Sequence, residues 1–172
     1  MTGPAAEAAS RAGRTELAGR IVAALTEQRR TIAVAESLTG GLLGATITAV
    51  PGASVVFRGG VIAYAPDVKA ALLGVPAELL AARGAVDPDV AAAMAAGVQQ
   101  RLGADIGVST TGVAGPDPAD GKRPGTVHIA VRAGGGTVGE TLALAGSRDE
   151  IRRRTVARCL RLVWSVIGEE GA

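Results

Sequence analysis

The sequence has few of the residues that build disulfide bonds and common metal sites. Its 172 residues include one cysteine, Cys159, and one histidine, His128. A single cysteine excludes an internal disulfide bond and a cysteine-based zinc site, and a single histidine excludes any site that needs two histidine ligands. We therefore expect a protein that works without a bound metal or another cofactor.

Aromatic residues and long apolar runs are also scarce. Phe57, Tyr64 and Trp164 are the only aromatic residues, which argues against single-strand nucleic-acid binders that stack bases on aromatic rings. The net charge of +2 is too small to indicate a nucleic-acid partner. No apolar run reaches the ~18 residues of a membrane span, and the N-terminus lacks the apolar stretch of a signal peptide. We therefore expect a cytoplasmic protein without a membrane partner.

Lysine is rare among the basic residues. Of the 18 basic residues 16 are arginines, and the two lysines are Lys69 and Lys122. A coding bias towards arginine would explain this ratio without any functional meaning. An arginine cannot lose its proton in a protein, however, whereas a lysine can. The two lysines are therefore candidates for a role that requires a neutral amine.

The order of the expected elements indicates an α/β fold. We interpret residues 1–13 as a flexible tail and residues 14–172 as one domain. The apolar spacing and the turn residues predict a mixed sheet that ends in a hairpin around Gly134–Gly136. Strands are expected at 31–35, 57–64, 105–109, 126–131 and 137–144. Helices are expected at 16–28 and 41–49, from Pro66 and from Pro76, at 88–102 capped by Asp87, and from the Ser147–Glu150 capping box to about 167.

Two polar runs follow expected strands. Residues 35–41 and 110–116 each place hydroxyl groups and glycines directly after an apolar run. Ligands of open α/β sheets bind at the carboxyl ends of the strands, and helix N-termini there favour anions. The two runs therefore predict one shared pocket.

The residue types in these runs allow more than one interpretation. Ser37 and Thr39 can simply cap the helix that follows them, and so can Glu36. Alternatively, Ser37 is a nucleophile and Lys69 is its base, because a desolvated neutral amine can take a hydroxyl proton. His128, which lies between Val127 and Ile129 in a strand, is interpreted as a half-buried structural histidine.

Three features of the last helix are interpreted separately. Cys159 falls on its apolar face and is expected to be a buried structural thiol. The run 152–154 is interpreted as a solvated helix face. Arg148 lies in the first turn, where the helix dipole disfavours cations. It pairs either with a ligand phosphate or with a surface carboxylate, and the sequence leaves this open.

Together the motifs resemble one family. The runs are AESLTGG (35–41), PGAS (51–54), GGVIAYAPDVKAALLGV (59–75), GAVDPDVAAAMAAG (84–97), ADIGVSTTGVAGP (104–116), GTVHIAV (125–131) and GSRDEIR (146–152). In this order they resemble the CinA C-terminal domain family. These proteins are also called competence/damage-inducible proteins and nicotinamide-nucleotide amidases (PncC-like). The resemblance covers residues 17–166.

The resemblance implies a fold and a reaction. The fold is a three-layer αβα sandwich with a mixed, mostly parallel sheet and a C-terminal hairpin and helix. The reaction is hydrolysis of nicotinamide mononucleotide to nicotinate mononucleotide and ammonia, in pyridine nucleotide recycling. The substrate partner is then a small nucleotide, and the chain is expected to form a homodimer.

The resemblance also assigns roles to residues. It implies that Ser37 is the nucleophile, that Lys69 is the base, and that Thr111 helps the amides of 112–115 to hold the oxyanion. The other expected substrate-binding residues are Thr39, Gly40, Gly41, Tyr64, Gly112, Ala114, Gly115 and Arg148. The amides of Gly40 and Gly41 are expected to hold the phosphate, although the two loops could exchange these roles.

A second hypothesis is a non-catalytic nucleotide- or partner-binding module linked to competence or recombination. Residues 65–66 favour it, because Ala-Pro replaces the Ser-Asn that many members of the family have at this point.

Overall fold

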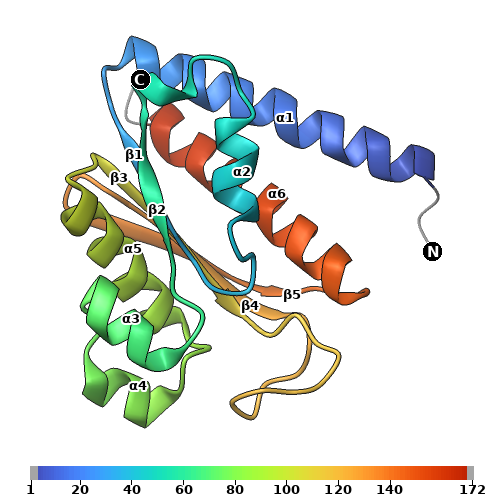
Figure 1. The fold of residues 1–172 in the computed structure, drawn as a ribbon, viewed down its shortest axis with the longest axis vertical. Coiled ribbons are helices and arrows are strands. Elements are labelled where there is room, and N and C mark those ends of the chain that lie inside the picture. Colours follow the sequence, from blue (N-terminus) through green and yellow to red (C-terminus); the bar gives the residue numbers. More distant parts are fainter. Residues whose placement is uncertain (1–3, 170–172) are drawn as a thin grey trace.

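One mixed β-sheet lies between two layers of helices (Figure 1). The computed structural model describes residues 4–169. The elements are α1 (Pro4–Glu27), β1 (Ile32–Glu36), α2 (Leu42–Thr48), η1 (Ala53–Val55), β2 (Phe57–Ile62), α3 (Pro66–Leu73), α4 (Ala77–Arg83), α5 (Pro88–Leu102), β3 (Ile106–Gly112), β4 (Thr126–Ala133), β5 (Gly136–Ala143) and α6 (Arg148–Glu169).

The sheet has the strand order β2-β1-β3-β4-β5. Strand β1 is parallel to both β2 and β3, whereas β4 is antiparallel to both β3 and β5. Strand β4 therefore runs opposite to the other four strands. Glu36 at the end of β1 pairs with Ile62 of β2 and Thr110 of β3. The loops that follow these three strands consequently leave the sheet at the same edge.

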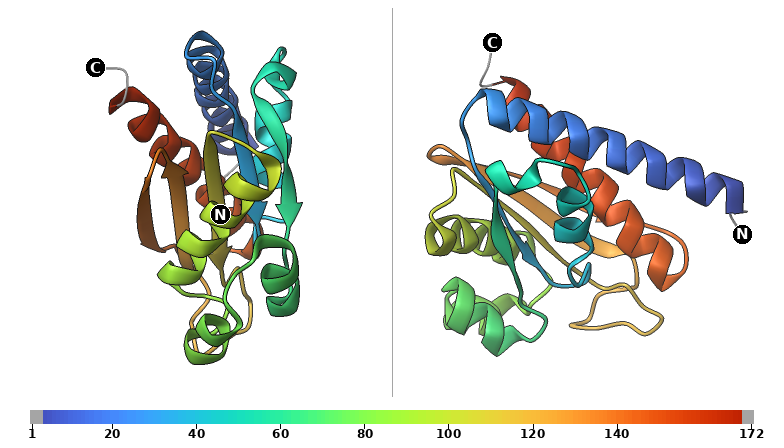
Figure 2. Two further views of the ribbon diagram at one scale, coloured as in Figure 1. Left: turned by 90° about the vertical axis from the view of Figure 1, so that its left-hand side faces the viewer. Right: turned by 45° about the horizontal axis from the view of Figure 1, so that its top comes forward.

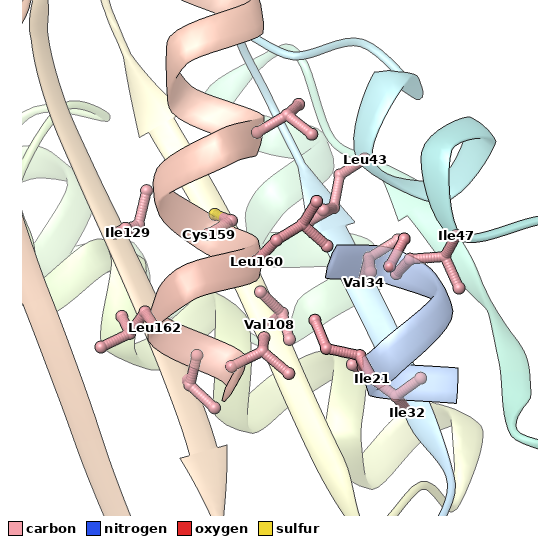
Figure 3. Close-up of a cluster of buried hydrophobic side chains, with 14 of the residues drawn as sticks. Ile21, Ile32, Val34, Leu43, Ile47, Val108, Ile129, Cys159, Leu160 and Leu162 are labelled. Atoms are coloured by element: carbon pink, nitrogen blue, oxygen red, sulfur yellow. The ribbon is translucent and has the colours of Figure 1, made fainter. Parts of the chain in front are cut away.

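Helices cover both faces of the sheet, as Figure 2 shows. Helices α1, α2 and α6 pack on one face, and α3, α4 and α5 lie on the other. The larger core cluster lies under α1, α2 and α6 and includes Ile21, Leu43, Val108 and Leu160 (Figure 3). The expected αβα sandwich is therefore confirmed.

Cys159 lies inside this larger core, as expected for a structural thiol (Figure 3). Its side chain is fully buried, and its Sγ donates to the Ser109 carbonyl over 3.9 Å. Burial raises the pKa of the Cys159 thiol far above its ordinary value because the thiolate would be desolvated. The thiol is consequently not a nucleophile at neutral pH.

On the other face, α5 approaches α3 closely. A Cβ added at Gly97 of α5 would lie 1.9 Å from the carbonyl oxygen of Leu73, so the contact requires glycine. This contact fixes the C-terminal end of α3, the helix that carries Lys69. The small residue at 97 therefore contributes to the placement of Lys69.

The N-terminal boundary differs from the expectation. Residues 4–13, expected as part of a flexible tail, are helical and extend α1 back to Pro4. The expected helix began at Glu16. The reason is the high helix propensity of the alanine, glutamate and arginine residues in this run, which needs no apolar period. Residues 1–3 of the expected tail lie outside the described residues.

The caps and the hairpin follow the sequence. Asp87 Oδ1 accepts from the Asp89 amide at 2.9 Å, and Glu150 accepts from the Ser147 amide at 2.8 Å. Strands β4 and β5 form the expected hairpin. Strand β3 runs three residues beyond the expected end at Ser109, because 110–112 continue to pair with β4. Among the described helices, none combines the length and the apolar character that crossing a membrane requires.

Candidate active site

A cavity of about 250 Å³ opens at the carboxyl ends of β1, β2 and β3. The loops after β1 and β3 both line it, so they share one pocket as the sequence predicts. The loop after β2, the turn before α5 and the start of α6 complete the wall. The lining residues are Ser37, Leu38, Tyr64, Pro66, Ala85, Val86, Thr111, Gly112, Val113, Ala114, Gly115, Asp117, Ala119, Asp120 and Arg148.

Ser37 and Lys69 are in direct contact. Ser37 follows β1 without a break, since its amide donates to the Thr110 carbonyl at 3.0 Å. Lys69 lies on α3, which begins at Pro66, a residue whose fixed φ suits the first helical position. The Lys69 Nζ lies 2.9 Å from Ser37 Oγ and donates at 2.6 Å to the Ala63 carbonyl. The structure thus brings the expected nucleophile and its expected base together.

The environment of Lys69 favours a neutral amine. Its side chain is fully buried, and none of the salt bridges among the described residues includes it. Loss of hydration lowers the pKa of Lys69 to about 8, although the charge of Asp120 acts in the opposite direction. Roughly a tenth of Lys69 is therefore neutral at pH 7, and this form can accept the proton of Ser37.

Part of the expected oxyanion site is already occupied by internal hydrogen bonds. Thr111 Oγ1 donates to the Ala85 carbonyl at 2.6 Å, and the Val113 amide donates to the Thr126 carbonyl at 2.9 Å. Thr111 therefore positions the turn before α5, and its hydroxyl proton is not directed at Ser37. The candidates that remain are the amides of Gly112, Ala114 and Gly115, three residues that all line the cavity.

Arg148 joins two walls of the cavity. Its guanidinium donates to the Gly115 carbonyl and to the Tyr64 hydroxyl, both at 2.8 Å. No ion pair among the described residues includes Arg148, so the surface carboxylate considered from the sequence is not its partner. Its exposed positive charge is held at the cavity by two neutral oxygen atoms. Arg148 and Tyr64 are thus brought to the site.

Thr39, Gly40 and Gly41 do not line the cavity, which corrects the expectation for these three residues. Thr39 is buried and its hydroxyl bonds to that of Thr110 at 2.7 Å. The Gly40 amide donates to the Ser37 carbonyl, and the Gly41 amide donates to the Glu36 carboxylate, both at 3.0 Å.

The reason lies in Glu36, which already caps α2. Its carboxylate also accepts from the Leu43 amide at 3.0 Å and from the Gly44 amide at 2.8 Å. The start of α2 therefore carries an internal anion in place of the expected phosphate. This arrangement keeps the loop that holds Ser37 rigid.

Sequence reasoning missed the role of Arg152. It was interpreted as part of a solvated helix face, but it donates to the Leu38 carbonyl at 3.1 Å and to the Thr39 carbonyl at 2.8 Å. It therefore secures the loop after Ser37 from α6. No local pattern could have shown this, because the contact spans more than 110 residues of chain.

Two acidic residues of the lining, Asp117 and Asp120, were also missed. The Asp120-Gly121 pair is a strong turn signal that could have located one of them. Across the described part of the chain, no group of three or more histidine, cysteine, aspartate or glutamate residues is placed to hold a metal ion.

His128 is outside the lining and is bound internally. Its Nδ1 lies 3.0 Å from the Thr141 hydroxyl, on the neighbouring strand β5. Burial lowers the pKa of His128, so the ring is neutral at physiological pH. The interpretation as a structural histidine agrees with this placement.

Comparison with known proteins identifies the family. The model of the CinA C-terminal domain matches residues 14–167. This chain belongs to the CinA C-terminal domain family. A CinA-like protein of Frankia casuarinae is 52% identical over 147 residues, which are 86% of this chain and 34% of that protein. A protein of Halalkalibacterium halodurans named as putatively competence-damage inducible is 47% identical over 143 residues, 83% of this chain and 34% of its own length.

Solved structures of the CinA family share the fold. The competence/damage inducible protein CihA of Agrobacterium tumefaciens superposes with a TM-score of 0.86 at 35% identity, covering 88% of this chain and 94% of that one. A CinA superfamily protein of Klebsiella pneumoniae gives 0.88 at 28% identity, with 91% and 98% covered. The chain spans about a third of the length of the curated relatives that it matches.

Proposed function

We propose that the chain hydrolyses the carboxamide of nicotinamide mononucleotide to nicotinate mononucleotide and ammonia. The observation that carries this proposal is the 2.9 Å contact between Ser37 Oγ and the buried Lys69 amine. A buried lysine without a carboxylate partner is unfavourable for the fold, and this one points at a hydroxyl in a cavity. Such a pair is suited to nucleophilic attack on an amide.

The acylation step uses these two side chains. Neutral Lys69 accepts the hydroxyl proton while Ser37 Oγ forms a bond to the carboxamide carbon. We assign the oxyanion to the amides of Gly112, Ala114 and Gly115, which line the cavity, and each such donor is worth roughly 3–4 kcal/mol of barrier. When the tetrahedral intermediate collapses, the C–N bond breaks and the Lys69 ammonium gives its proton to the departing amine. Ammonia leaves, and an ester to Ser37 remains.

Deacylation repeats the same proton path with water. Neutral Lys69 takes a proton from a water molecule, whose oxygen attacks the ester carbon. Collapse of the second intermediate returns the proton to Ser37 Oγ and releases the nicotinate product. The two steps together consume the substrate and one water molecule, and Lys69 is neutral again at the end.

The charges of the cavity suit a nucleotide with charges of both signs. Nicotinamide mononucleotide has a cationic pyridinium ring and an anionic phosphate. The lining offers the carboxylates of Asp117 and Asp120 and the guanidinium of Arg148. We assign the phosphate to Arg148, because planar guanidinium groups bind phosphate through two parallel hydrogen bonds. The substrate would replace the bonds that Arg148 makes to Tyr64 and Gly115.

The second candidate is a non-catalytic binding module, which the Ala65-Pro66 departure favours. The structure shows what this departure changes. Ala65 is the N-cap of α3 and gives no side-chain cap, whereas Pro66 still starts the helix and lines the cavity. The contact between Lys69 and Ser37 is present despite the missing cap. The departure therefore leaves the catalytic pair intact.

Release of ammonia from nicotinamide mononucleotide by the purified chain tests the proposal. Ser37→Ala is the test variant. Ser54→Ala is the matched control, because Ser54 is an exposed serine on η1 outside the cavity. We expect ammonia from the wild type and from Ser54→Ala, and none from Ser37→Ala. Binding of the nucleotide without ammonia release by the wild type would support the binding module instead.

Two further expectations belong to this proposal. We propose that the chain acts in the cytoplasm. We also propose that it works as a homodimer, as its family resemblance implies. Light scattering at the concentration of the assay should give twice the chain mass of 17.0 kDa. The mass of a monomer would contradict the homodimer.

A further inference from the structure

A second cavity lies between helices α1, α2 and α6, which Figure 1 shows together on one face of the sheet. Its volume is about 330 Å³, within the range of cavities that hold small ligands. Of the described residues that line it, none also lines the cavity of Ser37, so the proposed amidase mechanism does not account for it. We call it the arginine cavity after four residues of its lining, Arg11, Arg14, Arg152 and Arg153.

Two helices supply these arginines. Arg11 and Arg14 are three residues apart on α1 and therefore share one face of that helix. Arg152 and Arg153 come from α6, and α2, which forms the third wall, contains no charged residue. Arg14, Arg152 and Arg153 are half-buried, so they belong to the wall of the cavity and not to an open helix surface.

The acidic residues of this lining balance only part of the positive charge. They are Glu7 and Asp149, and both pair with the guanidinium of Arg153, Glu7 at 2.8 Å. The described lining thus has four positive charges and two negative ones, which leaves a net charge of +2. A cavity lined by an excess of one sign of charge attracts a ligand of the opposite sign, in this case an anion.

The electrostatic effect of this excess is evident at Arg14. Desolvation lowers the pKa of its guanidinium, and the positive charges of Arg153 and Arg11 lower it further. The charges of Glu7 and Asp149 act in the opposite direction with smaller effects. Like charges therefore outweigh opposite charges at Arg14, and a bound anion would relieve this repulsion.

Arg152 is held in a fixed direction by bonds to neutral groups. Its Nε donates to the Leu38 carbonyl at 3.1 Å, and its Nη2 donates to the Thr39 carbonyl at 2.8 Å. These bonds use two of the five N–H donors of a guanidinium, and no ion pair among the described residues includes Arg152. The charge of Arg152 therefore has no carboxylate partner among these residues, and three of its N–H donors remain for a ligand.

We propose that the arginine cavity binds the phosphate groups of a small polyphosphate anion, with Arg11 and Arg14 on one side and Arg152 on the other. A polyphosphate presents oxygens in several directions, so it can accept from guanidinium groups of two helices at once. A carboxylate presents only two oxygens in one plane. Inorganic pyrophosphate and a nucleoside diphosphate share the required chemistry. The binding requires no amidase activity of Ser37 and Lys69.

Isothermal titration calorimetry with inorganic pyrophosphate and, separately, with ADP tests the proposal. The test variants are Arg11→Gln and Arg14→Gln, because glutamine removes the charge and keeps the helix propensity of arginine. Arg58→Gln is the control for net charge, since Arg58 is an exposed arginine outside both cavities that donates to the Leu102 carbonyl. Arg148→Gln is the control for the cavity of Ser37. The ionic strength is low and constant, because salt screens contacts between charges.

We expect the wild type to bind pyrophosphate, and Arg11→Gln and Arg14→Gln each to weaken the binding roughly tenfold, because each removes a charge-assisted hydrogen bond. Arg11 is exposed, so its replacement leaves the core intact. Arg58→Gln and Arg148→Gln should leave the affinity unchanged. A wild type that binds neither pyrophosphate nor ADP would overturn the proposal, and so would an equal loss of affinity in either control variant.

The acidic side of the cavity gives a test of opposite sign. Glu7→Gln removes a negative charge from the lining, so it should strengthen the binding of pyrophosphate severalfold. Its matched control is Glu78→Gln, an exposed glutamate on α4, which should have no effect. Weaker binding by Glu7→Gln would contradict the proposal.

Amide NMR signals locate the ligand and distinguish its source. Shifts should concentrate at residues 11–15, 42–49 and 149–153, the segments that line the arginine cavity. Shifts confined to 111–117 would place the anion in the cavity of Ser37 and overturn the proposal. Tighter binding of ADP than of pyrophosphate identifies a nucleotide as the ligand, and equal affinities identify the polyphosphate group alone; each result supports the proposal. A wild type that releases no ammonia would end the proposed function and leave these results unaffected.

Discussion

A base that must be neutral gives a rate that rises with pH through its own pKa. With the pKa of Lys69 at about 8, the neutral fraction is roughly 0.1 at pH 7, 0.5 at pH 8 and 0.9 at pH 9. The kcat/KM for ammonia release should therefore rise about fivefold from pH 7 to pH 8 and less than twofold from pH 8 to pH 9. The measurement is the initial rate at low substrate concentration and constant ionic strength.

The same change in pKa affects the stability of the fold. An unfolded lysine keeps its proton up to about pH 10.4, so between about pH 8 and pH 10 the unfolded chain binds more protons than the folded one. Burial of Lys69 consequently destabilises the fold below pH 8, and this effect is relieved as pH rises through the window. Relative to Lys69→Met, the wild type should gain free energy of unfolding between pH 8 and pH 10.

Two results would refute this reasoning about the rate. A rise that continues tenfold per unit beyond pH 9 would mean that Lys69 has an ordinary pKa, so that burial does not activate it. A profile that is flat from pH 6 to pH 9 would mean that no group with a pKa near 8 acts as the base. Measurements on Ser37→Ala over the same range give the background that must be subtracted.

Two further predictions concern binding and packing. Arg148→Ala should raise the KM for nicotinamide mononucleotide by roughly 10- to 100-fold with little change in kcat, since it removes charge-assisted bonds to the phosphate. The control is Arg154→Ala, which should leave the KM unchanged. Arg154 lies on the same helix, and its guanidinium donates to the Ala145 carbonyl. In urea unfolding, Gly97→Ala should destabilise the fold by ~1–3 kcal/mol, because its Cβ would lie 1.9 Å from the Leu73 carbonyl. A Cβ added at Gly19 on α1 has no atom within 4 Å, so Gly19→Ala should stabilise the fold by ~0.5–1 kcal/mol through the higher helix propensity of alanine. Equal effects of the two substitutions would contradict the packing described for α5.

Local signals in the sequence were enough to place most elements. The cap at Asp87, the capping box at Ser147 and the glycines at 134–136 each act within a few residues, and the structure contains all three features. The pairing of Ser37 with Lys69 was predicted because lysine is rare among the basic residues, a desolvated neutral amine can take a hydroxyl proton, and the resemblance to the family connected the two residues.

One local contact and one long-range contact explain where the sequence expectations differ from the structure. The amide of Gly41 was expected to bind a phosphate, but it donates to the carboxylate of Glu36, five residues earlier, which is the capping alternative that the sequence left open. Arg152 was interpreted as solvated, yet the packing of α6 turns it towards the loop after Ser37. Which polar side chain of a helix turns back onto a loop depends on how the helices pack on the sheet, and the apolar periodicity does not specify this.

The exchange of Lys69 for arginine tests the central claim most directly. Arginine keeps the positive charge and most of the length but cannot lose its proton near neutral pH. We predict that Lys69→Arg still binds nicotinamide mononucleotide but releases no ammonia from it at any pH between 7 and 9. If Lys69→Arg retained most of the wild-type rate, Lys69 would serve only as a positive charge, and the account of a Ser37–Lys69 catalytic pair would be wrong.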